Sequence, residues 1–510
     1  MFEMEFFRPL STGFLSLASD RLIDYLHQTE NGLPVTTLLP PEGLRRAYTE
    51  GGIPLGLEDD QNAEAPEKLL EAMRLTLQYS TCTSHPLFFN QLYGGPEPAG
   101  IAGEWLTVVA NTNCHTFEVA PVFTLVETEV LAKLARVIGG PYSDAHDGLF
   151  VPGGSIANIY GMHLARNRAD PEVKRRGAVG GPHLVAFTSE QAHYSYLKAV
   201  ALTGLGSDNL IGVACDDSGA MCPAALQEAI MAVKGEGKTP FFVGATAGTT
   251  VTGAFDPLEP LAEVCREHGL WLHVDAAWGG AALLSRKLRH HMAGCEQADS
   301  LCWNPHKLLG MPLQCSVFLT RHAAILKQTN ASGAAYLFQP DKLNAEYDLG
   351  DKTIQCGRRP DAFKLWLAWK AYGDAGLERW VDRSAELAEA FARKIEGSKG
   401  AFQLVMQEAP FNVCFWWVPP QLRPFRPDQA SAADKALLSK VAPAIKEAMQ
   451  HKGDAMIGFQ PLRDAPNFFR IVFAGAKLLK DCCLDDLLHQ MDDYGQHLFP
   501  AQCNLDAGEI

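Results

Sequence analysis

The sequence LWLHVDAAWGG, residues 270–280, decides how the rest of the chain is interpreted. Residues 270–274 are mostly apolar and predict a buried strand, which Asp275 follows directly. The segment WNPHK, residues 303–307, comes further on and ends in Lys307. A carboxylate at a strand end is costly to bury unless it is paired. Together with the lysine it suggests a cofactor site, although a core strand followed by an exposed lysine explains these residues equally well.

Pyridoxal 5′-phosphate (PLP) would use both charged residues. Its protonated pyridine nitrogen is a suitable partner for Asp275, and this ion pair keeps the ring an electron sink. Lys307 would form the Schiff base, because a buried, cationic neighbourhood lowers the pKa of a lysine and frees its amine for attack. The segment between the two residues allows one further helix and strand.

Short apolar runs alternate with helical segments from Gly148 to about Asn330. This rhythm predicts an α/β fold with a mostly parallel, doubly wound sheet. In such sheets ligands gather at the carboxyl ends of the strands. The predicted strands are 149–151, 184–188, 211–215, 240–245, 270–274 and 315–319.

Three of these strand ends carry candidate ligand contacts. Gly154 and Ser155 precede a strong helix, where backbone N–H groups and a hydroxyl can hold a phosphate, although such a turn is usually just an N-cap. His193 can stack on an aromatic cofactor ring, but a helix start capped by Ser189 explains it as well. Thr246 can hydrogen-bond to a cofactor edge or belong to a tight turn.

The flanking segments predict three parts, with a helical N-terminal segment at 1–110, a large domain at 111–395 and a small α/β domain at 396–510. Apolar spacing predicts the helices 12–37, 66–79, 98–113, 122–138, 360–372, 377–395, 433–451 and 483–498. Residues 43–62 are rich in glycine and acids and predict a loop. The small domain carries the predicted strands 402–406, 413–418 and 468–473.

Composition excludes several classes of function. The net charge of -15 over 510 residues argues against nucleic acid or an anionic membrane as partner. The 13 cysteines are scattered without metal-ligand spacing, so we expect no metal and a reduced, cytoplasmic chain. We also expect no secretory signal and no membrane helix, because no apolar run is long enough.

The motifs at 273–280 and 304–307 resemble the signature of the group II PLP-dependent amino-acid decarboxylases. Residues 88–92, 117–123 and 355–358 resemble its acidic-substrate branch, which includes glutamate, cysteine sulfinate and aspartate 1-decarboxylases. The resemblance runs from about Phe88 to the C-terminus. It implies PLP fold type I, as in aspartate aminotransferase, and a homodimer with its sites at the interface.

The resemblance also implies a role for each matching residue. Lys307 is the implied Schiff-base lysine, Asp275 the partner of the pyridine nitrogen and His193 the residue that stacks on the ring. Ala277 would pack on the other ring face, and Thr246 would lie near the ring. The residues implied at or near the phosphate are Gly154, Ser155, Asn304 and His306.

The same resemblance points to residues around the substrate. Arg470 matches an arginine that pairs with a substrate carboxylate, and its apolar flanks argue against a surface ion pair. Gln91 would add a polar contact. Asn113 resembles the glutamate enzymes, whereas Tyr93 resembles the bulky residue of the cysteine sulfinate and aspartate enzymes and would shorten the pocket. His115 fits neither branch, where an aromatic residue is usual, and a histidine there can donate to a second acid group.

One loop departs from the family pattern. Family members usually carry a tyrosine about two residues after Lys342, and this tyrosine returns a proton to the substrate carbon. Here Asn344 stands in that place, the loop is one residue shorter and Tyr347 matches a later tyrosine. Either Tyr347 or His193 then delivers the proton, or protonation at the wrong carbon leads to abortive transamination.

These observations predict a cytoplasmic carboxy-lyase that uses PLP to decarboxylate a small acidic amino acid. Cysteine sulfinate, giving hypotaurine for taurine biosynthesis, is the favoured substrate, and aspartate, giving β-alanine, is a further candidate. Glutamate, giving γ-aminobutyrate, is the main alternative. A PLP-fold binding protein without catalysis and another PLP reaction, such as an aldehyde-forming oxidation, are the alternatives of other classes.

Overall fold

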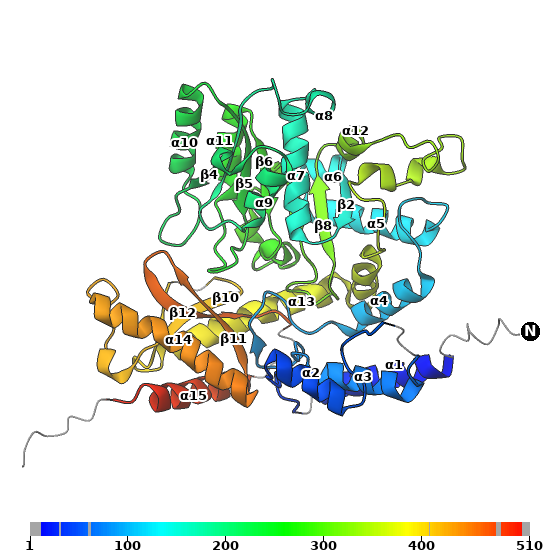
Figure 1. The fold of residues 1–510 in the computed structure, drawn as a ribbon. Coiled ribbons are helices and arrows are strands. Elements are labelled where there is room, and N and C mark those ends of the chain that lie inside the picture. The colour runs from blue at the N-terminus through cyan, green and yellow to red at the C-terminus, as the bar shows by residue number, and fades with distance from the viewer. Residues whose placement is uncertain (1–11, 30–31, 60–62, 407–408, 476–480, 502–510) are drawn as a thin grey trace, which may run out of the picture.

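A seven-stranded sheet forms the centre of the computed structural model, which describes residues 12–29, 32–59, 63–406, 409–475 and 481–501. The strand order is β2-β8-β7-β6-β5-β3-β4 (Figure 1). Neighbouring strands are parallel except at β8, which runs antiparallel to both β7 and β2. The strands are β2 (Asp147–Val151), β3 (Leu184–Ser189), β4 (Leu210–Val213), β5 (Thr239–Thr246), β6 (Trp271–Asp275), β7 (Ser300–Trp303) and β8 (Ser316–Thr320). The predicted mostly parallel, doubly wound sheet is confirmed.

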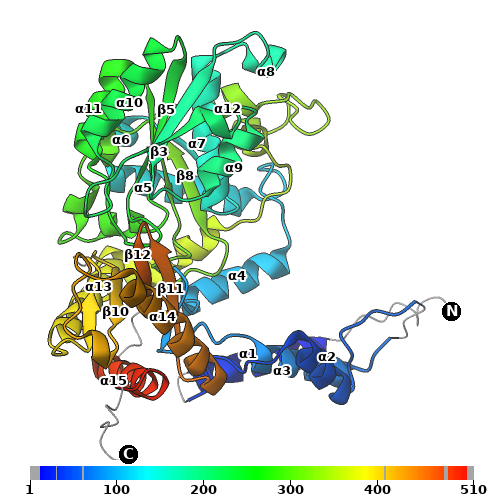
Figure 2. The ribbon, with the colours of Figure 1, turned by 60° about the vertical axis from the view of Figure 1, so that its left-hand side comes forward.

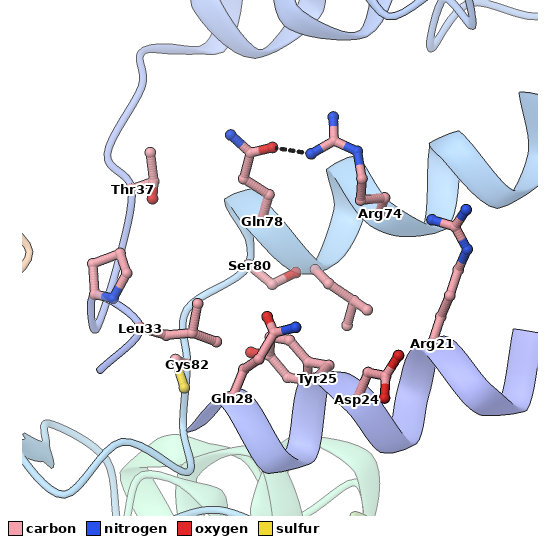
Figure 3. A pocket seen from close by; sticks show the side chains of 12 residues that line it. Arg21, Asp24, Tyr25, Gln28, Leu33, Thr37, Arg74, Gln78, Ser80 and Cys82 are labelled. Atoms are coloured by element: carbon pink, nitrogen blue, oxygen red, sulfur yellow. Dashed lines mark hydrogen bonds between the residues drawn. The ribbon is translucent and has the colours of Figure 1, made fainter. Parts of the chain in front are cut away.

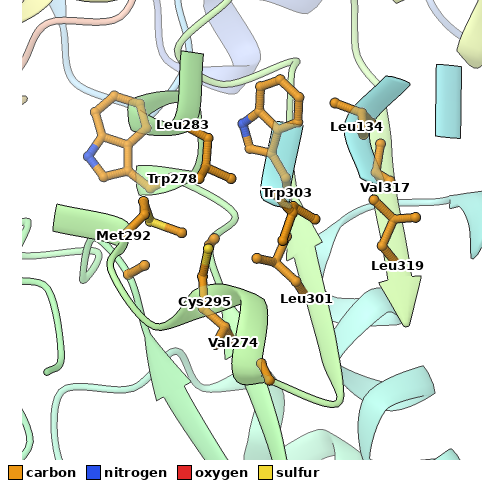
Figure 4. Packing of buried hydrophobic residues seen from close by; sticks show 14 of the residues in the cluster. Leu134, Val274, Trp278, Leu283, Met292, Cys295, Leu301, Trp303, Val317 and Leu319 are labelled. Carbon is orange, nitrogen blue, oxygen red and sulfur yellow. The ribbon is translucent and has the colours of Figure 1, made fainter. Parts of the chain in front are cut away.

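Helices cover both faces of this sheet, as apolar strand residues on each face require. One face packs against α7 (Gly154–Ala169) and α9 (Ser195–Leu202), which share a hydrophobic cluster with Trp271 and Phe318. The other face packs against α5 (Pro121–Ile138), α10 (Pro223–Gly235) and α11 (Leu258–His268). Trp278 and Trp303 lie in this second cluster and pack the residues that follow β6 against the sheet (Figure 4).

A second sheet of five strands lies beside the first, in the order β1-β11-β12-β10-β9. It is covered by α14 (Ala432–Lys452) and α15 (Asp481–Leu498), while α13 (Ala362–Glu396) runs between the two sheets (Figure 1). Its strands are β1 (Phe88–Phe89), β9 (Phe402–Leu404), β10 (Asn412–Trp417), β11 (Met456–Leu462) and β12 (Ala465–Val472). Because β1 pairs with β11, the N-terminal part contributes a strand to the C-terminal sheet.

The N-terminal helices α1 (Thr12–Thr29), α2 (Pro41–Glu50) and α3 (Pro66–Tyr79) form an arm that projects from the body (Figure 2). Helix α4 (Pro98–Ala110) connects this arm to the large sheet and packs along α13. No helix within the described ranges is long and apolar enough to cross a bilayer.

Most predicted elements are confirmed, and two predictions are wrong. Residues 43–62 were expected to be a loop, but α2 occupies their first part, with a proline in its first turn and Glu42 near its N-terminus. Helix α1 ends at Thr29 instead of Thr37. The two helices expected at 360–372 and 377–395 are confirmed: within α13 they meet at a kink, where Gly373 has non-helical backbone angles. Between Asp275 and Lys307, where the spacing allows one helix and one strand, the chain forms short 3₁₀ turns and the strand β7.

Three strands were not located from the sequence, namely β1, β7 and β11. Each is short or mixed in character, so its alternation gives little signal. The division into three parts at residues 110 and 395 stays a prediction.

Candidate functional site

A cavity of about 170 Å³ lies where the carboxyl ends of β5 and β6 meet the N-terminus of α7. This is the edge at which parallel strands of an α/β sheet bind ligands. Eight residues predicted from the sequence to hold the cofactor line it together: Gly154, Ser155, His193, Thr246, Asp275, Ala277, Asn304 and Lys307.

Asp275 is buried at the end of β6 and is held by three donors. Asn158 Nδ2 donates to its Oδ2 at 2.7 Å, while the Ala277 N–H and Cys302 Sγ donate to Oδ1 at 3.0 and 3.2 Å. Burial alone would raise the pKa of Asp275, but the Lys307 charge and these donors outweigh it and lower the pKa. Asp275 is therefore an ionised carboxylate that faces the cavity and suits a cationic ring nitrogen.

Lys307 reaches the cavity from the turn after β7. The surrounding protein lowers the pKa of its amine by desolvation, the nearby Asp275 raises it, and the Arg470 charge lowers it further. The net direction is downward, so that the neutral, nucleophilic form of the amine is more accessible than in a lysine in water.

The phosphate end of the site is built around the first turn of α7. This 16-residue helix presents free N–H groups at its N-terminus, where an anion is favoured. A Cβ at Gly154 would lie 2.8 Å from Asn304 Nδ2, so any larger residue would force the Asn304 amide to move. Two buried polar atoms, Thr246 Oγ1 and Asn304 Oδ1, have no hydrogen-bond partner among the residues that the structure describes. Buried polar atoms are costly to leave unpaired, so both fit a polar ligand such as PLP.

His193 lies on the cavity wall in the loop between β3 and α9. Its Nδ1 accepts a hydrogen bond from the Ser195 N–H at 3.2 Å, and its ring packs on Tyr194 with centroids 4.2 Å apart. Burial lowers its pKa, and this outweighs the raising effect of Asp275. A neutral, fixed imidazole at this place suits stacking on an aromatic ring.

His306 lies apart from the eight cavity residues, although the sequence places it beside Lys307. Its Nδ1 donates to the Cys315 carbonyl at 2.8 Å, and burial lowers its pKa to about 4. The ring therefore braces the turn between Asn304 and Cys315 that holds Lys307. Its predicted role at the phosphate stays a prediction.

Arg470 on β12 approaches the cavity from the second sheet. Its Nη1 donates to the Thr250 carbonyl and its Nη2 to the Asn90 carbonyl, each at 2.8 Å, and Thr250 lines the cavity. Among the described residues its buried Nε has no hydrogen-bond partner, and no carboxylate is close enough to raise its pKa. A buried guanidinium held by carbonyls keeps its charge available for an acidic ligand.

Five predicted residues lie away from this cavity. Gln91 is exposed, and Tyr93 packs against Phe88 with ring centroids 6.2 Å apart. Asn113 Oδ1 accepts from the Arg358 N–H at 2.8 Å, so this side chain fixes a backbone turn. The remaining two belong to the same neighbourhood: His115 Nδ1 contacts the Asn113 carbonyl, and the Tyr347 ring packs on Phe117 at 5.3 Å.

Sequence reasoning missed Asn158 and Cys302, which both hold Asp275. Asn158 lies one helical turn after Gly154 and therefore on the same face of the helix. Counting four residues on from the predicted phosphate turn would have identified it. Cys302 pairs with Asp275 in the register of β6 and β7, and a strand that was not predicted gives no register.

A larger cavity of about 620 Å³ lies between α1 and α3 in the N-terminal arm (Figure 3). Its lining includes Tyr25 and Cys82, and Arg74 donates to Gln78 at its rim. None of the predicted cofactor or substrate residues lines this cavity.

Comparisons with known proteins agree with the geometry. Residues 52–418 match the family model described as the pyridoxal-dependent decarboxylase conserved domain. Cysteine sulfinic acid decarboxylase of Mus musculus is 48% identical over 87% of this chain and 89% of its own length, and the Homo sapiens protein of that name gives the same values. A crystal structure of mouse CSAD superposes with a TM-score of 0.89 at 43% identity, covering 95% of this chain and 98% of that one. Oryza sativa TDC with PLP and tryptamine superposes with a TM-score of 0.85 at 25% identity, covering 97% of this chain and 100% of that one.

Proposed function

The chain belongs to the pyridoxal-dependent decarboxylase family, and from this premise we propose that it removes the α-carboxyl group of cysteine sulfinate. It is a carboxy-lyase with PLP as its cofactor and the fold of that family. One observation carries the proposal. The buried guanidinium of Arg470 lies at the edge of the cavity that Lys307 and Asp275 line.

Each residue that lines the cavity has a separate role toward the cofactor. When bound, PLP would supply an electron sink for the bond that breaks at the substrate carbon. Asp275 holds a negative charge against the ring nitrogen, and Lys307 supplies the amine that ties the cofactor to the protein. His193 and Ala277, which line the cavity, would pack against the two faces of the ring. The N-terminus of α7 with Ser155 and Asn304 holds the phosphate.

Arg470 supports an acidic substrate. A guanidinium binds a carboxylate or sulfinate through two parallel hydrogen bonds, and its partners in the chain are neutral carbonyls. The mouse and human relatives are named for cysteine sulfinic acid, which agrees with this charge. Gln91 and Tyr93 lie on the segment whose Asn90 carbonyl holds Arg470, and we propose that they shape the same end of the pocket.

We also propose a homodimer whose sites lie at the interface. Helices α4 and α5 present exposed apolar side chains that a monomer rarely leaves in water. These are Trp105, Leu106, Val108, Val109, Val122 and Leu125. Because Asn113, His115 and Tyr347 lie away from the cavity of their own chain, we propose that they serve the cavity of the second copy. We place the dimer in the cytoplasm, since the ten described cysteines from Cys82 to Cys414 are free thiols.

A competition assay tests the substrate. We expect kcat/KM to be highest for cysteine sulfinate when cysteine sulfinate, aspartate and glutamate are compared on the same preparation. A clear preference for glutamate would overturn the substrate and leave the decarboxylase reaction intact. The visible absorbance of bound PLP should be lost in Lys307→Ala and kept in Lys238→Ala, a surface lysine paired with Glu236. Bound PLP without carbon dioxide release from any amino acid would point to a binding protein.

A further inference from the structure

A continuous line of buried hydrogen bonds runs behind Asp275 and ends on its carboxylate. Trp271 Nε1 donates to Ser300 Oγ at 2.9 Å, and Ser300 Oγ lies 2.8 Å from His273 Nδ1. His273 Nε2 lies 3.0 Å from Asn158 Oδ1, and Asn158 Nδ2 donates to Asp275 Oδ2 at 2.7 Å. All five side chains are buried.

The alternation of side chains along β6, the register of β6 and β7 and the packing of α7 together place these five side chains in line. Residues 271, 273 and 275 alternate along β6 and therefore share one face of the sheet. Ser300 lies directly opposite His273 on the neighbouring strand β7. Helix α7 packs on that face and contributes Asn158.

The direction of every bond follows from its Asp275 end. An ionised carboxylate only accepts, so Asn158 turns its N–H group to Asp275 and its carbonyl to His273. His273 Nε2 must then carry a proton and donate. His273 Nδ1 is left as an acceptor for the Ser300 hydroxyl, whose oxygen in turn accepts from Trp271. The line therefore has a single polarity, with each group donating toward Asp275.

The packing fixes His273 in this form. Its ring lies between those of Phe242 and Phe318, with centroids 6.0 and 6.1 Å apart. A Cβ at Gly161 would lie 2.7 Å from Nδ1, so the helix backbone closes over the ring. Burial lowers the pKa of His273 to about 4, so the ring is neutral near pH 7 and acts through its fixed tautomer.

We propose that Asn158 and His273 are positioning residues that set the basicity of Asp275 and thereby keep the proton on the ring nitrogen of PLP. This inference rests on the proposed function. A carboxylate that accepts strong hydrogen bonds is less basic, so the shared proton stays on the nitrogen. The other titratable groups around Asp275 are Lys307, His193, Cys302 and Tyr196.

The second N–H bond of Asn158 extends the same control to His193. Asn158 Nδ2 also donates to Ser195 Oγ at 2.8 Å, and the Ser195 N–H donates to His193 Nδ1. One amide therefore fixes both groups that contact the cofactor ring, the carboxylate at its nitrogen and the imidazole on its face.

Nitrogen-15 NMR of the protein reconstituted with PLP labelled at the ring nitrogen tests the proposal. In His273→Phe the aromatic packing remains but the donor to Asn158 is lost. We expect the proton to shift from the ring nitrogen toward Asp275 by about tenfold in the equilibrium between the two positions, as one hydrogen bond to a charged group allows. His273→Gln, whose amide can replace the Nε2–H donor, should restore most of the wild-type signal.

Phe318→Leu is the matched control, because it loosens the packing on the same ring and leaves the hydrogen bonds in place. An unchanged nitrogen signal in PLP-loaded His273→Phe overturns the inference, as does an equal shift in Phe318→Leu. Should His273→Phe fail to fold or to bind PLP, Ser300→Ala carries the test, with a smaller shift in the same direction as support and no shift as refutation. Wild-type protein that binds no PLP would instead refute the proposed function.

Discussion

Cys302 Sγ donates a hydrogen bond to Asp275 Oδ1 at 3.2 Å, from the strand position directly opposite. Burial raises the pKa of this thiol well above its usual value, so it stays protonated and remains a donor. A thiol placed this way helps to hold the charge of Asp275 and has no need to be reactive.

We expect Cys302→Ala to weaken PLP binding about fivefold, equivalent to roughly 1 kcal/mol for one lost hydrogen bond. Titration of apoprotein with PLP, followed by visible absorbance, measures this change. Cys302→Ser should retain most of the affinity, because a hydroxyl can donate to the same oxygen. Cys265→Ala removes another buried cysteine and should leave PLP affinity unchanged; equal loss in both alanine variants would refute the role of Cys302.

Gly154→Ala should damage the phosphate end of the site, because the added Cβ would press on Asn304. We expect PLP affinity to fall about tenfold or more while the fold persists, since a shift of a few tenths of an ångström already disturbs a preorganised site. Gly235→Ala is the matched control, as a Cβ at that helical position meets open space. Unaltered PLP affinity in Gly154→Ala would show that the start of α7 does not hold the phosphate.

Asp299 should make stability depend on acid pH. Burial alone would raise its pKa, but the His322 hydrogen bond, the Arg168 and Arg321 charges and the Leu272 N–H bring it down to about 2 from 3.8. A folded pKa below the unfolded value stabilises the fold above pH 3.8, and this contribution disappears as the pH falls toward 2. Its size is about 2 kcal/mol.

Urea denaturation of Asp299→Asn and wild type at several pH values measures this contribution. The difference in the free energy of unfolding should be largest near neutral pH and shrink below pH about 4. Asp217→Asn, on the exposed loop after β4, should match wild type throughout. A difference that stays constant with pH would exclude the charge of Asp299 as its cause.

Tyr93 should influence which acid is preferred. We expect Tyr93→Ala to shift kcat/KM toward glutamate relative to cysteine sulfinate by roughly tenfold, because a shorter side chain makes room for one more methylene. Phe88→Leu alters the aromatic neighbour of Tyr93 without removing the tyrosine and should shift the ratio less. An unchanged ratio in Tyr93→Ala would show that this residue does not limit pocket length.

Mixed dimers test whether two chains share a site. Lys307→Ala should be inactive because it lacks the amine, and Tyr347→Phe should decarboxylate poorly if Tyr347 returns the proton. Refolding the two variants together should restore partial activity, since one site then receives both intact residues. Activity no higher than that of the separate variants would place Tyr347 and Lys307 in the same chain's site, and a fully active Tyr347→Phe would leave His193 as the proton donor.

The sequence predicted the cofactor site because its residues follow local rules. Asp275 closes a clear apolar strand and Gly154 stands at a strand-to-helix turn, so strand ends suggested the site, and the resemblance to the PLP-dependent decarboxylases decided between a cofactor site and an ordinary core. Cys302 and Ser300 were not predicted, because β7 has only four residues and shows no clear alternation of apolar and polar residues. Their roles depend on strand register, which is a property of the folded sheet.

The substrate side was harder to predict for a different reason. Arg470 acts through carbonyls of Asn90 and Thr250, which come from distant segments, and no local pattern reports such contacts. Asn113 matched a family position, yet its side chain also fixes the backbone at Arg358. Tyr347 matched a loop tyrosine, and its distance from the cavity of its own chain depends on the path of the whole loop.

The separation of Arg470 from its partners along the chain has a consequence for synthesis. Arg470 lies 220 residues after Thr250 and 380 after Asn90, whereas every cavity residue that would contact PLP lies between Gly154 and Lys307. Domains generally fold as units from the N-terminus as the ribosome extends the chain. The nascent protein therefore carries all its cofactor ligands long before it can bind an acidic substrate, so the cofactor can be loaded first.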